Sequence, residues 1–126
     1  MLRTCVILFL SSLMLLACKK GNNTSPVSGK WIESKDRADT LIFDSESFLS
    51  ILRGKELSSG HLLPKAWSGM YFYSIKSDSI TVHYSLSSNS RQYTYVYSLQ
   101  GNELTIGDFY KKNQTQGSVL KFTRLR

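Results

Sequence analysis

The sequence predicts an all-β fold, a small antiparallel barrel of eight strands joined in chain order by short turns. Hydrophobic residues recur with a period of two over most of residues 29–126, which places alternate side chains on opposite faces of a strand. Short polar segments such as Ser77-Asp78 and Gln100-Gly101-Asn102 separate these runs at hairpin spacing. No long segment shows the period of a helix. An up-and-down barrel leaves no free strand edge, but a sandwich split along a seam also fits the pattern.

The first segment of the chain has the pattern of a secretory leader. A short basic start, Met1-Leu2-Arg3, precedes an almost wholly apolar run at residues 5–16. A run of roughly a dozen residues suits the apolar region of a signal peptide and is too short for a membrane span of about 20. We therefore expect residues 1–17 to be a signal peptide.

Leu15-Leu16-Ala17-Cys18, which ends this run, resembles the lipobox of bacterial lipoproteins. The resemblance implies that the leader is cut before Cys18, which then carries a diacylglycerol thioether and an acylated amine, with chains such as palmitate. Several acyl chains on one residue anchor a protein stably, whereas one chain holds it marginally. The alternative is an ordinary signal peptide with a cysteine near the cut by chance.

Residues 18–28 are polar, with Gly, Pro and Ser, and are expected to be the lipid anchor and a flexible tether. Asp does not follow Cys18, which favours the outer membrane over the inner one. Lys19 and Lys20 stand where many surface-exported lipoproteins carry acidic residues, which favours the periplasmic face. The sequence thus predicts a lipoprotein of the cell envelope, attached to the membrane through Cys18.

The strands are expected in order from residue 29 onward. The predicted ranges are 30–34, 40–43, 48–53, 69–75, 80–86, 93–99, 103–109 and 118–124. β-Branched and aromatic residues dominate them, as strands prefer. Residues 54–68, which include Gly60 and Pro64, are expected to be a loop over one end of the structure, with room for a single helical turn.

Length and charge limit the number of domains and the kinds of partner that the chain can have. Residues 29–126 are long enough for one domain with one modest core. The formal net charge is +7, but the basic residues are scattered, and the tightest pairs are Lys19-Lys20 and Lys111-Lys112. No nucleic-acid-binding motif accompanies them, so we expect no nucleic-acid partner. A monomer is expected.

Two short motifs carry a family resemblance. Gly29-Lys30-Trp31 resembles the Gly-x-Trp that opens the first strand of lipocalins, and Phe122-Thr123-Arg124 resembles the last strand, where an arginine lies across that tryptophan. With its leader, the chain is similar to short lipocalin-like lipoproteins of the Bacteroides group. The resemblance implies a structural end plug of Trp31 and Arg124, held by a cation–π contact, and a small apolar ligand. An eight-stranded barrel can instead be filled by its own side chains, and the sequence leaves both open.

Aromatic residues supply the candidate binding site. Six tyrosines lie on or near the middle strands: Tyr71, Tyr73, Tyr84, Tyr93, Tyr95 and Tyr97. They either line a cavity or pack the core and neighbouring strands. Face alternation selects Tyr73, Tyr84 and Tyr95 as the candidate ligand contacts. Trp67, in the predicted loop, is either a lid contact or a hydrophobic clasp for that loop.

Motifs for chemistry are absent from the sequence. His61 and His83 are the only histidines, and no metal-ligand spacing accompanies them. No serine lies in Gly-x-Ser-x-Gly, and there is no glycine-rich phosphate loop. We therefore expect no cofactor, no metal and no enzymatic activity.

These observations predict a membrane-anchored, lipocalin-like binding protein for a small apolar or amphipathic ligand. The alternative is a protein-interaction or inhibitor module with a filled barrel that acts through its outer surface.

Overall fold

The computed structural model describes residues 24–44, 47–110 and 118–126, and these contain ten β-strands and no helix. The strands are β1 (Gly29–Glu33), β2 (Thr40–Phe43), β3 (Phe48–Leu52), β4 (Lys55–Ser58), β5 (His61–Pro64), β6 (Gly69–Lys76), β7 (Ser79–Tyr84), β8 (Tyr93–Gln100), β9 (Glu103–Gly107) and β10 (Val119–Arg124). Cys18 and the rest of residues 1–23 lie outside the described residues.

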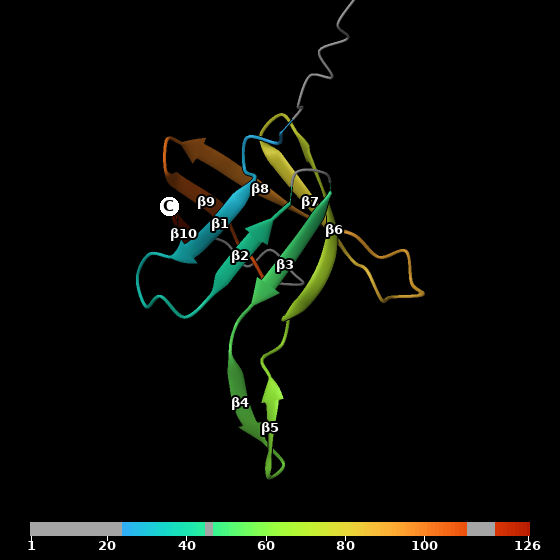
Figure 1. Cartoon of the computed structure of the whole chain (residues 1–126). Helices are drawn as coiled ribbons and strands as arrows, with labels where there is room; N and C mark the ends of the chain where they lie inside the picture. Colours follow the sequence, from blue (N-terminus) through green and yellow to red (C-terminus); the bar gives the residue numbers. More distant parts are fainter. Residues whose placement is uncertain (1–23, 45–46, 111–117) are drawn as a thin grey trace, which may run out of the picture.

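Eight of the strands form a closed barrel in which every neighbour is antiparallel (Figure 1). Their order is β1-β2-β3-β6-β7-β8-β9-β10, and β10 returns to pair with β1. The closing register places Arg124 opposite Trp31 and Phe122 opposite Glu33. The predicted all-β, eight-stranded up-and-down barrel of lipocalin-like form is confirmed, and the closed ladder excludes the split sandwich.

The segment predicted to be a loop at residues 54–68 is a β-hairpin instead. β4 and β5 pair with each other and stand off the barrel (Figure 1). The turn between them is Ser59-Gly60, and both residues have positive φ, 50° and 79°. That combination is the type I′ geometry that two-residue hairpins favour, and Ser-Gly is its sequence signal. The sequence does not predict the two strands, because all eight of their residues are exposed and apolar residues do not alternate with polar ones.

Two predicted strands are shorter than expected at one end. β7 stops at Tyr84, so Leu86 lies in the following turn and is 82% exposed. β9 stops at Gly107, because Asp108 has a φ of 50°, which an extended strand does not accommodate. The other boundaries agree with prediction within one residue.

The barrel interior is filled by side chains. Trp31, Phe43 and Phe122 are its largest members that are almost fully buried. Aromatic rings meet edge to face inside it, with centroids 5.0 Å apart for Phe43 and Tyr73 and 5.2 Å for Tyr95 and Phe109. Edge-to-face pairs contribute beyond the area they bury. The filled interior leaves the two ends of the barrel as the places where function can be sought.

The two ends differ in what covers them. At one end, the Trp31 end, residues 24–28 enter the barrel and the short turns 77–78 and 101–102 connect the strands. At the other, the Trp67 end, lie the longer connections 34–39, 53–68 and 85–92, and residues 108–110. The β4–β5 hairpin projects from this second end, on the far side of the barrel from residues 24–28 (Figure 1).

Candidate functional site

The Trp31 end is sealed by an arginine and a tryptophan. The Arg124 guanidinium lies 4.3 Å from the centroid of the Trp31 ring, which is the contact that the lipocalin resemblance implies. Arg124 donates hydrogen bonds to the carbonyls of Ser28 at 2.5 Å and Pro26 at 2.9 Å. The Trp31 indole N–H donates to the Val27 carbonyl at 2.7 Å. Both side chains therefore tie residues 26–28 across the end of the barrel.

Gly29 is required at this end for two reasons. Its φ is 121°, a conformation that residues with a side chain rarely adopt. A Cβ at this position would lie 3.2 Å from Nη1 of Arg124. The glycine of Gly-x-Trp thus turns the chain into β1 and leaves room for the arginine.

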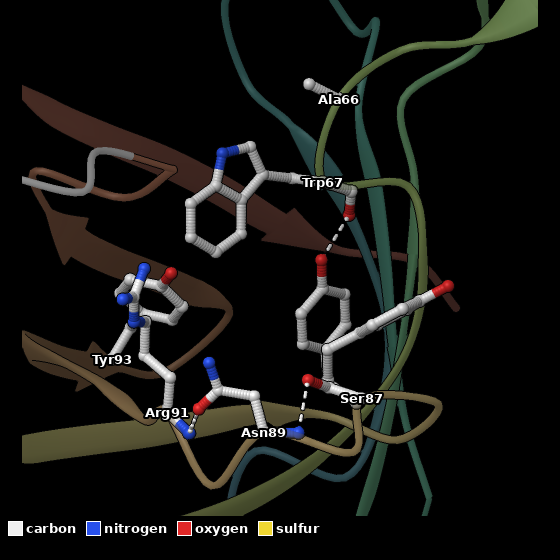
Figure 2. A pocket seen from close by; sticks show the side chains of 8 residues that line it. Ala66, Trp67, Ser87, Asn89, Arg91 and Tyr93 are labelled. Atoms are coloured by element: carbon white, nitrogen blue, oxygen red, sulfur yellow. Dashed lines mark hydrogen bonds between the residues drawn. The ribbon is translucent and has the colours of Figure 1, made fainter.

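A pocket of about 410 Å³ lies at the Trp67 end (Figure 2). It falls within the range of small-molecule sites. Residues from the β5–β6 connection, β6, β7, the β7–β8 loop and β8 line it. They are Ala66, Trp67, Tyr71, Tyr84, Ser87, Asn89, Arg91 and Tyr93, and we call this set the Trp67 pocket.

Aromatic rings form the walls of the Trp67 pocket. Trp67 meets Tyr93 edge to face, with centroids 4.9 Å apart and planes at 72°. On its other side it lies nearly parallel to Tyr71, at 6.3 Å and 18°. Tyr71 and Tyr84 are 5.2 Å apart. The pocket therefore offers a ring-lined surface of mixed polarity at the mouth of a filled barrel.

Trp67 holds a strained backbone conformation. Its φ is 71°, in the left-handed region, where a bulky residue is rare. Such strain costs about 1–3 kcal/mol and persists only where the surroundings enforce it. Here the Tyr71 hydroxyl donates to the Trp67 carbonyl at 3.2 Å, and the Ser68 N–H donates to the Lys65 carbonyl at 3.0 Å. The strain and these bonds place the indole over the pocket.

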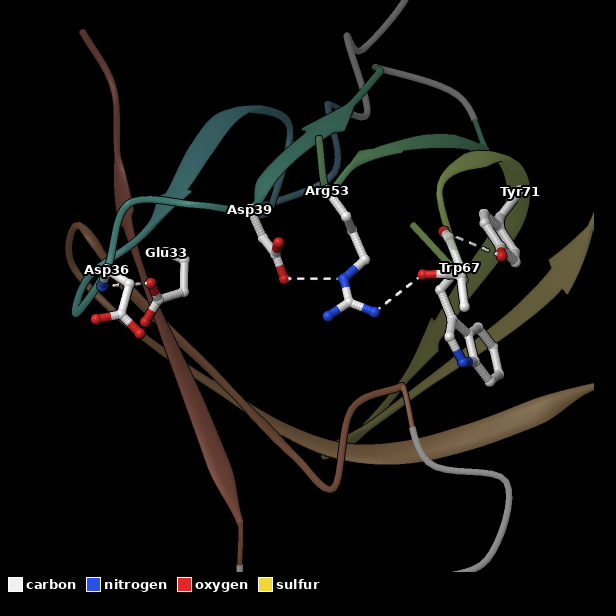
Figure 3. A network of polar contacts seen from close by, with 7 residues as sticks. Glu33, Asp36, Asp39, Arg53, Trp67 and Tyr71 are labelled. Carbon is white, nitrogen blue, oxygen red and sulfur yellow. Dashed lines mark hydrogen bonds and ion pairs between the residues drawn. The ribbon is translucent and has the colours of Figure 1, made fainter. Parts of the chain in front are cut away.

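Arg53 connects the loops that support Trp67 (Figure 3). Its Nε donates to the Asp39 carboxylate at 3.1 Å, and its Nη1 donates to the Ala66 carbonyl at 2.9 Å. The guanidinium also lies 4.1 Å from the centroid of the Tyr110 ring. One side chain thus joins three connections at this end, so the pocket wall rests on a fixed support.

The pKa values of two buried tyrosine hydroxyls at this end, those of Tyr71 and Tyr110, are raised. Burial raises the pKa of Tyr71 to about 12, and the neighbouring Tyr84 and Tyr93 add to the increase. Burial also raises the pKa of Tyr110, with a further contribution from the Asp39 carboxylate. These groups therefore act as neutral hydrogen-bonding groups.

Polar groups of the β7–β8 loop form the rim of the pocket. The Asn89 side-chain oxygen accepts from the Arg91 backbone N–H at 2.9 Å, and the Asn89 N–H donates to the Ser87 hydroxyl at 3.1 Å. Figure 2 shows the side chains of Asn89 and Arg91 rising from this loop toward the Trp67 indole. The loop thus orders itself and directs its donors at the pocket.

The three tyrosines predicted as ligand contacts fall in different places. Tyr84 lines the Trp67 pocket and is 37% exposed. Tyr73 is buried in the core, where its hydroxyl donates to the Asp44 carbonyl at 3.1 Å. Tyr95 is buried against Phe109. The structure therefore brings only Tyr84 of the three to the pocket.

Sequence reasoning did not single out Tyr71, Tyr93, Asn89 or Arg91 for this site. Tyr71 and Tyr93 share their strand faces with Tyr73 and Tyr95, but each lies two residues nearer the Trp67 end. The alternation of side chains along a strand shows which face a residue lies on, but not its position along the barrel axis. Closeness to the longest predicted loop was the available signal.

Within the described ranges, no group of three or more His, Cys, Asp or Glu side chains is arranged to hold a metal ion. His83 contacts the Arg91 carbonyl through Nδ1 at 3.0 Å, and His61 lies exposed on the hairpin. No helix in this part of the chain is long and apolar enough to span a membrane.

Comparisons of the chain with protein-family models, with curated proteins and with solved structures find no match in any of the three. The likeness to lipocalins thus depends on the barrel topology, on Gly29 and Trp31 at the start of β1, and on Arg124 across the ring.

Proposed function

We propose that this chain is a membrane-anchored, lipocalin-like binding protein, non-catalytic, for a small amphipathic ligand held in the Trp67 pocket. The observation that carries the proposal is a pocket of about 410 Å³ with aromatic walls and hydrogen-bond donors at its rim. Apolar walls with a few placed polar groups are the usual composition of small-molecule sites. Because side chains fill the barrel, the ligand lies at the mouth and not in the interior.

The position of the pocket agrees with an anchor at Cys18. Residues 24–28 enter at the Trp31 end, and the pocket opens at the Trp67 end. A protein tethered through its N-terminus to the periplasmic face of the outer membrane would thus present the pocket away from the lipid. Labelling of the wild type with radioactive palmitate, and its loss in Cys18→Ser, tests the anchor.

The two tryptophans make the pocket directly testable. Trp31 is fully buried at one end, whereas Trp67 lines the pocket at the other. Titration with the lipophilic dye N-phenyl-1-naphthylamine should quench tryptophan emission in the wild type. In Trp67→Phe the indole wall is lost, so the fluorescence of the dye itself should report weaker binding than in the wild type.

A matched pair of variants distinguishes dye binding in the pocket from non-specific binding to exposed aromatic rings. Tyr84→Ala should weaken dye binding, because Tyr84 forms one wall. Phe72→Ala removes a similarly exposed ring, 42% against 37%, from the outer face of β6 and should leave binding unchanged. Absence of any Trp67 response, or equal loss in both variants, would contradict the proposal.

The β4–β5 hairpin favours a second function, a protein-interaction module. Leu57 and Leu62 face each other across the hairpin and are 76% and 62% exposed. Each hairpin strand pairs only with the other, so each keeps a free edge in the described structure. Lys55 and Lys65 flank the leucines against one acid, Glu56. The fitting partner is an extended, acidic segment of another envelope protein, which would add a strand to this edge.

Partner capture from periplasmic extract tests this second function when two variants are compared. Leu57→Ser with Leu62→Ser should abolish capture of a specific partner whose bound segment carries acidic residues. Val96→Ser removes an equally exposed side chain, 64%, from β8 and should retain it. Capture that survives the hairpin variant would exclude this edge as the docking site.

A further inference from the structure

The charge of the Trp67 pocket points to the class of ligand. Of the eight residues that line it, Arg91 alone carries a full charge at neutral pH. No carboxylate in the described structure lies within ion-pair distance of its guanidinium. The Asn89 side-chain oxygen and the Ser87 hydroxyl oxygen already accept backbone N–H groups, which leaves the Asn89 amide N–H and the Ser87 O–H as donors beside the tyrosine hydroxyls. The rim is therefore built to receive acceptors and negative charge.

Two acids at this end of the barrel, Asp39 and Glu33, are engaged within the chain. Asp39 holds Arg53, and the Glu33 carboxylate accepts backbone N–H groups of Lys35 at 2.9 Å and Asp36 at 2.6 Å (Figure 3). Neither lines the pocket. The positive charge of Arg91 is thus not neutralised by the described acids at this end.

The aromatic walls define the shape of the ligand's apolar part. Trp67 and Tyr93 stand at 72° to each other, so a flat ring can lie on the face of one against the edge of the other. Such offset and edge-to-face contacts are the favoured arrangements of rings. Arg91 is exposed at the rim, so its attraction for an anion acts partly through solvent and is weakened by salt.

We infer that the Trp67 pocket binds a ring-bearing organic anion, with its flat ring system against Trp67 and Tyr93 and its acidic group at Arg91. This inference rests on the proposed binding function and adds the charge and shape of the ligand. A carboxylate or sulfonate accepts two parallel hydrogen bonds from a guanidinium, which fixes orientation as well as affinity.

Two dyes with the same ring system test the inference. 1-Anilinonaphthalene-8-sulfonate carries an acidic group, and N-phenyl-1-naphthylamine lacks it. The wild type should bind the sulfonate more tightly. Arg91→Gln should weaken sulfonate binding about tenfold and change binding of the neutral dye little, because a charge-assisted contact at a partly exposed site is lost. Raising NaCl from about 50 mM to about 500 mM should also weaken only the sulfonate.

Arg126→Gln is the matched control. Arg126 is exposed and follows β10 at the opposite end of the barrel, so its loss removes the same charge without touching the pocket. Sulfonate binding should not change. An equal loss in both variants would mean that net charge alone acts, and would overturn the inference.

The outcomes separate this inference from the proposed function. If both dyes quench Trp67 equally well and Arg91→Gln affects neither, the pocket binds ligands but has no preference for anions, and the inference fails alone. If neither dye affects Trp67, the proposed function fails with it. A selective loss of sulfonate binding in Arg91→Gln supports both.

Discussion

The two ends of the barrel use the same side-chain chemistry for opposite purposes. At the Trp31 end, an arginine covers a buried tryptophan and donates to two carbonyls, so the ring and the guanidinium find their partners within the chain. At the Trp67 end, Arg53 does the equivalent for Tyr110, Asp39 and Ala66. In contrast, Arg91 has no described acid partner, and part of the aromatic wall faces the pocket. An end whose polar and aromatic groups all have partners within the chain closes the barrel. An end where some of these groups face a pocket can bind a ligand.

The comparison predicts first that the two tryptophans contribute very differently to stability. Trp31→Ala should lower the free energy of unfolding by about 3–5 kcal/mol, because it leaves a cavity in a filled interior. Trp67→Ala should cost less, about 1–2 kcal/mol, since the ring is only half-buried and its loss leaves a smaller cavity. Urea denaturation monitored by circular dichroism measures both. Equal losses would contradict the distinction between the ends.

The next largest expected difference in stability is between variants of two arginines, Arg124 and Arg91. Arg124→Gln should lower the free energy of unfolding by about 2 kcal/mol, because a part-buried hydrogen bond to Ser28, an exposed one to Pro26 and the contact with Trp31 are lost together. Arg91→Gln should change it by about 0.5 kcal/mol or less, since its side chain holds no described acid. A destabilising Arg91→Gln would indicate a structural role and weaken the assignment of Arg91 to the pocket.

Substitution of a glycine at each end should affect different properties: dye binding at the Trp67 end, and stability alone at the Trp31 end. At Gly69, which has a φ of 143°, an added Cβ would lie 2.9 Å from the Tyr84 ring. Gly69→Ala should therefore displace a pocket wall and reduce dye binding several-fold, besides costing about 1–2 kcal/mol of stability. Gly29→Ala should cost a similar amount of stability but leave dye binding intact, because its Cβ approaches Arg124. Dye titration and urea denaturation of both variants check this, and unchanged binding in Gly69→Ala would argue against Tyr84 as a wall.

The smallest expected effect is on stability at high pH. The pKa of Tyr71 is about 12 in the folded chain, against about 10 when unfolded, so the folded state holds its proton more tightly. Its contribution is complete below about pH 10 and is lost as the pH rises toward 12. The share of Tyr71 in the loss of stability should therefore be about 1–2 kcal/mol over this range. Tyr71→Phe should remove that share and leave the part that comes from the raised pKa values of Tyr95 and Tyr110. Urea midpoints at about pH 9 and pH 11 test it, and an identical fall in the variant would assign the effect elsewhere.

Much of the barrel could be predicted because its signals are local. Ile80 and Val82 are buried while Thr81 and His83 alternate with them, as the period of two in the sequence requires. The β4–β5 hairpin was missed because its leucines never enter a core, so no alternation marks its strands. Ser59-Gly60 was the one local sign, and it specifies a turn without saying that the flanking segments pair.

The candidate site could be predicted only in part, because it joins residues that are distant in the chain. Tyr84 lies at the mouth of the barrel, whereas Tyr73 and Tyr95 on comparable faces lie deeper in the interior. Which tyrosines reach the mouth depends on strand register and on where each strand ends. For Trp67 the sequence allows a lid contact or a hydrophobic clasp, and a ring that packs against Tyr71 and Tyr93 beside the pocket fits both.

By itself the sequence determined the strand class, the order of the eight barrel strands and the plug of Trp31 and Arg124, because alternation, turn residues and a short motif act over a few neighbouring residues. Only the tertiary structure decided that the interior is full and that the free aromatic faces and Arg91 meet at one end. Packing density and the closing register between β1 and β10 are properties of the whole barrel, and no local segment of the chain encodes them.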